Sequence, residues 1–110
     1  MMKIIMKSLN LIFLTIIFIS IIGCATILTK EGKFVKLFVK QEAPSNAEFL
    51  GDIETSFLGE PSVKGVKNYL RNKTAKMGGN LVVIDFIDVT YNRNDGTKMY
   101  SGDGRAYRVK

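Results

Sequence analysis

An apolar run near the N-terminus limits how much of this 110-residue chain can form a folded domain. Residues 1–7 contain Lys3, Lys7 and no acid, residues 8–22 are almost wholly apolar, and the small residue Gly23 follows. A basic start, an apolar stretch and a small residue before the cleavage point are the three parts of an export signal. We therefore assign residues 1–23 to a signal peptide, which leaves 87 residues for the mature chain.

Cys24 is the candidate modification site. Residues 21–24, Ile-Ile-Gly-Cys, resemble the lipobox of bacterial lipoproteins, in which the thiol receives a diacylglyceryl group and the signal is removed. The resemblance implies cleavage between Gly23 and Cys24 and attachment to a membrane through two lipid chains, which together hold a protein stably. The alternative is an uncleaved anchor, because the apolar run from residue 9 to residue 28 has about the length that spans a bilayer. Both interpretations place the following domain outside the cytoplasm.

The residue types present exclude several kinds of active site. The chain has no histidine and one cysteine, so a Ser-His-Asp triad, a Cys-His pair, a Cys/His zinc cluster and an internal disulfide are excluded. Asp85 and Asp88 stand three apart in an apolar stretch, which predicts that they point to opposite faces of a strand unless a bulge intervenes. Since acid–base catalysis needs two converging groups, we expect no enzyme, and we expect neither a metal nor another cofactor.

The charge pattern gives one candidate contact surface. Without Lys3 and Lys7, residues 24–110 carry 14 basic and 10 acidic side chains, a net charge of +4. Lys64, Lys67 and Arg71 would share one face of a helix and could contact lipid phosphate or an acidic partner. The simpler alternative is the ordinary charged outer face of a helix in a small domain. No aromatic side chain shares this helix face with the three charges, so we expect no nucleic-acid partner.

The first half of the mature chain is predicted to contain a tether and two strands. Residues 24–32 are assigned to a lipidated tether and residues 33–110 to one small domain. Residues 34–40 alternate as a strand, with Val35, Leu37 and Val39 on one face. Residues 47–57 are the second predicted strand, and Gly51 could mark a bulge in it.

The second half is predicted to contain a helix and two further strands. The helix opens at residues 59–62, carries an apolar stripe and stops at residues 78–79, which are both glycine. Residues 80–91 are apolar enough for a central strand, and residues 92–96 form a turn. The returning strand is predicted at residues 97–100 and 105–109, interrupted at residues 101–104. The apolar stripe consists of Val63, Val66, Leu70 and Met77.

These elements predict an α+β fold in the order β-β-α-β-β, a mostly antiparallel sheet with one helix packed on a face. Leu70 lies in the middle of the apolar stripe, and the strand at residues 80–91 is the most apolar segment of the mature chain. We expect Leu70 to pack against Val83 or Ile84 as the main contact between the helix and the sheet.

Four short stretches between residues 47 and 107 form a pattern: Phe49-Leu50-Gly51, Tyr69-Leu70-Arg71-Asn72-Lys73, Gly78-Gly79-Asn80-Leu81-Val82-Val83 and Gly104-Arg105-Ala106-Tyr107. With this pattern the segment resembles a group of small bacterial outer-membrane lipoproteins. One neighbouring family is the Rcs-type envelope-stress sensor lipoprotein, which reports on the cell envelope through protein partners. The resemblance implies a lipid-anchored envelope protein, in the outer membrane if the host has two membranes, that works through an envelope protein partner without catalytic activity. The alternative is a stress sensor or regulator that switches partners.

Overall fold

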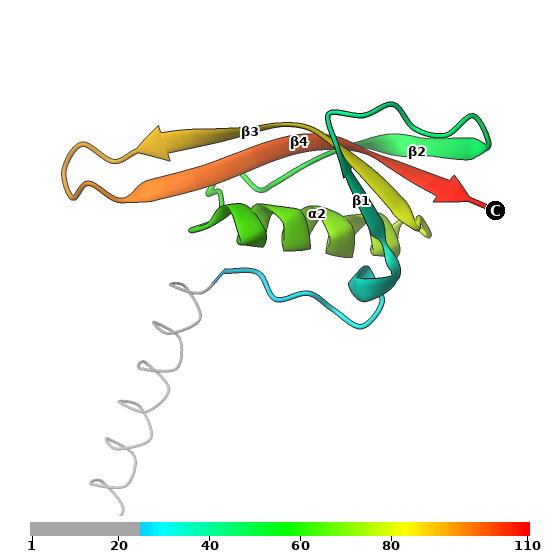
Figure 1. Cartoon of the computed structure of the whole chain (residues 1–110). Helices are drawn as coiled ribbons and strands as arrows, with labels where there is room; N and C mark the ends of the chain where they lie inside the picture. The colour runs from blue at the N-terminus through cyan, green and yellow to red at the C-terminus, as the bar shows by residue number, and fades with distance from the viewer. Residues whose placement is uncertain (1–24) are drawn as a thin grey trace, which may run out of the picture.

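A computed structural model describes residues 25–110, so the expected signal peptide and Cys24 lie outside the described residues. The α+β fold and the β-β-α-β-β order are confirmed, with an α-helix packed against a four-stranded sheet (Figure 1). The elements are η1 (Gly32–Phe34), β1 (Lys36–Val39), β2 (Ala47–Glu54), α2 (Val63–Lys76), β3 (Leu81–Tyr91) and β4 (Lys98–Val109).

The sheet is mixed, with the strand order β1-β3-β4-β2. Strand β4 pairs antiparallel with both β3 and β2, whereas β1 pairs parallel with β3. Because β1 and β2 form opposite edges, the connection through residues 40–46 crosses the face of the sheet that α2 does not cover (Figure 1). We call this face the outer face and the face under α2 the inner face.

Helix α2 begins directly after Ser62, the last of the four residues predicted to open it, and ends at Lys76, just before the two glycines predicted to stop it. The Ser62 side chain accepts a hydrogen bond from the Gly65 N–H at 3.0 Å, which satisfies a free amide of the first turn. At the other end Gly78 adopts φ 82°, a left-handed conformation that glycine allows without strain. The polar residue on the apolar stripe, Thr74, is buried and donates from Oγ1 to the Leu70 carbonyl at 2.8 Å.

The main apolar core lies between α2 and the inner face. Leu70 and Ile84 belong to the same buried cluster, in agreement with one of the two predicted partners. Val83 points to the outer face, where it forms a smaller cluster with Leu81 and Tyr107. Strand β3 therefore supplies apolar side chains to both faces, as expected for a central strand. The larger cluster consists of Val35, Ile53, Val66, Leu70, Val82, Ile84 and Ala106.

Strand β4 runs unbroken from Lys98 to Val109, so the predicted interruption at residues 101–104 is wrong. The glycines in this stretch serve close packing instead of a turn. A Cβ on Gly102 would stand 2.6 Å from Val66 Cγ1, and a Cβ on Gly104 would stand 2.6 Å from the Val83 carbonyl oxygen. Glycine in a strand often marks such a close approach, here between β4 and α2 at Gly102 and between β4 and β3 at Gly104.

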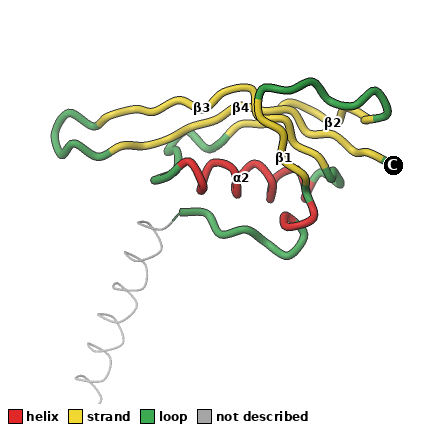
Figure 2. The backbone as a smooth tube through the Cα atoms, viewed as in Figure 1, coloured by secondary structure: helices red, strands yellow, loops and turns green. Residues whose placement is uncertain are grey.

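The segment that precedes η1 forms a further layer. Residues 25–31 lie along the side of α2 that faces away from the sheet (Figures 1 and 2). The predicted strand at residues 34–40 is shortened, because η1 occupies Gly32–Phe34. Within residues 25–110, no helix is both long and apolar enough to cross a bilayer.

Candidate functional site

The tether is held on α2 by side chains that bind its backbone. Asn72 uses both ends of its amide group. Its Oδ1 accepts from the Thr29 N–H at 2.9 Å and from the Thr29 hydroxyl at 3.1 Å. Its Nδ2 donates to the Ile27 carbonyl at 2.8 Å. Two of these three bonds are made with the main chain, so they fix the path of the segment, and the Thr29 hydroxyl adds the third.

Two further residues extend this attachment toward the start of α2. Asn68 Nδ2 donates to the Thr26 carbonyl at 3.0 Å, and Glu60 Oε1 accepts from the Thr26 N–H at 3.0 Å. Glu60 is 8 % exposed, and this bond gives its buried carboxylate a partner. We name Glu60, Asn68 and Asn72 the tether clasp. The predicted tether is therefore bound to the domain over most of its length.

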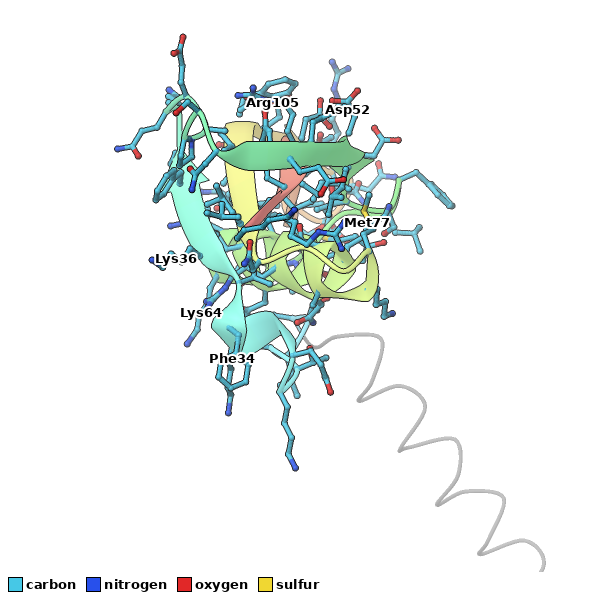
Figure 3. All side chains as sticks on the ribbon, turned by 90° about the vertical axis from the view of Figure 1, so that its right-hand side faces the viewer. Phe34, Lys36, Asp52, Lys64, Met77 and Arg105 are labelled. Atoms are coloured by element: carbon cyan, nitrogen blue, oxygen red, sulfur yellow. The ribbon has the colours of Figure 1, made fainter. Side chains whose placement is uncertain are left out.

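The predicted basic face is divided between structural and exposed positions. Arg71 donates from Nε to the Val35 carbonyl at 3.0 Å and from Nη2 to the Lys33 carbonyl at 3.1 Å, so its guanidinium fixes the chain around η1. Lys64 is exposed and borders a hollow of about 570 Å³ along the tether. Lys67 is half-buried. Figure 3 shows Lys64 on the helix side of the molecule.

The outer face of the sheet carries an ordered group of aromatic and charged side chains. Arg105 Nη2 lies 2.9 Å from Asp85 Oδ1, and Arg105 Nη1 donates to the Tyr107 hydroxyl at 2.9 Å. The hydrogen bond to Asp85 raises the pKa of Arg105 above its ordinary value. Phe49 meets the Tyr107 ring edge to face, with 5.6 Å between the centroids. Figure 3 shows Arg105 on the side of the sheet away from α2.

Asp85 and Asp88 share the outer face and do not point to opposite faces of β3. The pairing of β3 with β4 shifts register between Ile84 and Phe86, and this bulge adds Asp85 as an extra residue. Asp88 lies opposite Ser101 in the same ladder. The exception stated for a bulge therefore applies.

These acids raise the pKa of a neighbour. Burial raises the pKa of Asp103, and the charges of Glu54, Asp88 and Asp85 raise it further. An open hollow of about 520 Å³ lies beside them and also receives Lys73 from α2. Among residues 25–110, no three His, Cys, Asp or Glu side chains are arranged to hold a metal ion. The acidic residues thus make the outer face locally negative and favour the protonated form of Asp103.

The clasp residues were not identified from the sequence. The pattern contained one signal for them, since Asn68 and Asn72 stand four apart in a helix although asparagine is a weak helix former. Residues at this spacing share a helix face, so the two amides present their polar groups on the same side of α2. Comparison with protein-family models, with curated proteins and with solved structures found no match.

Proposed function

We propose that this chain is a lipid-anchored envelope protein, attached to the membrane through Cys24, that acts by contact with another envelope protein and not by catalysis. The lipobox-like residues 21–24 support the anchor. The proposed contact with another protein rests on the exposed aromatic residues of the outer face of the sheet. Phe49 is 54 % exposed and Phe86 is 46 % exposed on either side of the Arg105 and Tyr107 pair.

This surface has the composition of a protein-binding site. Aromatic residues and arginine are enriched at the centres of protein interfaces, where they contribute most of the binding free energy. Arg105 is already oriented by Asp85 and Tyr107, so binding would cost little additional ordering of its side chain. The surrounding carboxylates form a polar rim that would favour a partner with basic residues at the edge of its contact surface.

A photo-crosslinking experiment in intact cells tests the contact. A photoreactive amino acid is placed at Phe49 in one protein and at Lys76, an exposed residue of α2, in another. We expect a discrete protein adduct from position 49 and none of the same mass from position 76. Equal adducts from the two positions, or none from position 49, would show that the outer face is not the contact surface.

The lipid anchor is tested separately with Cys24→Ser. The variant should lose metabolic lipid labelling and accumulate as an uncleaved precursor in the membrane fraction, because the modified thiol is needed before the signal is removed. Processing of the variant to the same mature size as the wild type would refute the anchor. In a host with two membranes, we expect the mature protein in the outer membrane on density fractionation.

A further inference from the structure

The loop between β2 and α2, residues 55–62, exposes two large apolar side chains. Phe57 is 97 % exposed and Leu58 is 67 % exposed. The loop is fixed to β4 at both ends. The Thr55 N–H donates to the backbone of β4 at 3.1 Å, and Glu60 and Tyr100 exchange two backbone hydrogen bonds of 2.7 Å. An ordered backbone that presents adjacent apolar residues to water indicates a contact surface.

The chain that leads to the anchor leaves the domain beside this loop. Glu60, three residues after Phe57, binds the Thr26 N–H. Ala25 Cβ lies 3.2 Å from the place that a Cβ on Gly65 would take. Cys24 stands two residues before Thr26, so the chain between them spans at most about 7 Å. A lipid on Cys24 therefore enters the membrane close to the loop.

The adjoining side of α2 is basic and aromatic. Lys73 Nζ donates to the Glu54 carbonyl at 3.4 Å, immediately before the loop, and lies 5.9 Å from the centroid of the Tyr69 ring. Tyrosine suits the headgroup layer of a membrane, and lysine is attracted by anionic lipid. A hollow of about 300 Å³ connects this side with the tether and is lined by Thr26, Tyr69, Asn72, Lys73 and Lys76.

We propose that Phe57 and Leu58 insert into the interface of the lipid bilayer that holds the anchor, with Lys73 and Lys76 at the headgroups. The domain then lies against the membrane and not on a free stalk. This inference rests on the proposed anchor at Cys24. The position of the loop favours lipid over a protein as its occupant, because a short attachment beside Glu60 keeps Phe57 at a high effective concentration near the bilayer.

A tryptophan placed at position 57 can report this contact, because the chain contains no tryptophan of its own. The processed full-length Phe57→Trp protein is reconstituted in vesicles of phosphatidylethanolamine and phosphatidylglycerol with brominated acyl chains. We expect blue-shifted emission that the bromine quenches. Phe34→Trp is the matched control, since Phe34 is a phenylalanine in η1 that is 82 % exposed. Its emission should remain unshifted and unquenched.

A second variant tests the electrostatic part. Lys76→Glu in the Phe57→Trp protein should reduce quenching in vesicles with phosphatidylglycerol more than in vesicles of a zwitterionic lipid alone. If Phe57→Trp stays unquenched while the protein floats with the vesicles, the membrane contact is refuted, the anchor stands, and the loop is left for a protein partner. Equal quenching at positions 34 and 57 also refutes the proposal. A missing lipid label on Cys24 refutes the lipid anchor alone. The quenching measurement still tests whether the loop contacts the membrane, because an uncleaved apolar anchor would also lead into the domain next to Glu60.

Discussion

Leu70 is one of the two buried side chains, with Val66, that pack α2 into the apolar core against the sheet. It has no exposed surface and belongs to the cluster that contains Ile84 and Val66. Removing most of a buried leucine typically costs about 2–5 kcal/mol, because apolar contacts are lost and a cavity remains. Since the whole free energy of unfolding of a small domain is about 5–15 kcal/mol, we expect Leu70→Ala to lower the Tm sharply. Lys67→Ala on the same helix should change the Tm little in the same calorimetric measurement. Similar small shifts for both variants would mean that α2 is not docked through Leu70.

Asp103 should make stability depend on pH in an unusual direction. Its pKa is raised above the ordinary 3.8 by burial and by the neighbouring acids, so the folded state binds a proton more tightly than the unfolded state does. The favourable contribution of the protonated form is therefore fully present below pH 3.8 and is lost as pH rises through the raised pKa. We expect Asp103→Asn to raise the Tm at neutral pH, with a gain that shrinks toward pH 3.8.

Asp95 provides a control of opposite sign for this measurement. Its pKa is lowered from 3.8, first by the Thr97 backbone N–H and then by the Thr97 hydroxyl. Its contribution is present above pH 3.8 and is lost as pH falls through the lowered pKa. Asp95→Asn should thus lower the Tm slightly at neutral pH. Equal slopes of Tm against pH for the two variants would contradict the assigned environments.

At the scale of elements, the attachment of the tether to α2 depends on Asn72. Asn72→Ala removes three hydrogen bonds to residues 27–29, each worth about 0.5–1.5 kcal/mol. We expect the Thr29 amide to lose its protection in hydrogen-exchange measurements, while the amides of β3 keep theirs. Asn92→Ala in the exposed hairpin turn is the control and should leave Thr29 protected. Unchanged protection in Asn72→Ala would show that the clasp does not hold the tether.

Some elements of the fold could be predicted from the sequence and others could not. Helix α2 was predictable because Ser62, the apolar stripe and Gly78 are local signals, and β3 because its apolar run is long. The partner of the clasp was not predictable: the spacing of Asn68 and Asn72 places two amides on one helix face, but Thr29 lies 43 residues from Asn72. The bulge at Asp85 depends on the register with β4, which no strand reveals by itself. Gly102 has the residue type of a turn, and only its contact with Val66 of α2 explains why glycine is needed inside a strand.

At the scale of the whole molecule, both apolar clusters depend on β3. Val82 and Ile84 face α2, while Leu81 and Val83 pack with Tyr107 on the outer face. Because neighbouring residues of one strand serve both clusters, we expect one cooperative unfolding transition. Tyrosine emission and far-ultraviolet circular dichroism should give the same denaturant midpoint, and Leu70→Ala should shift both equally. Separate midpoints would mean that the two clusters unfold independently.

The central position of β4 has a consequence for the time at which the domain can fold. This strand follows all the others in the chain, yet it lies between β3 and β2. During synthesis β2 therefore has no strand to pair with until Lys98–Val109 has emerged. The ladder between β2 and β4 that then forms joins residues far apart in the chain, which slows folding, whereas β3 and β4 pair as a local hairpin. A growing chain of this kind stays open until its final strand is made. A chain in this state remains unfolded, which is the state that an export channel for unfolded chains requires.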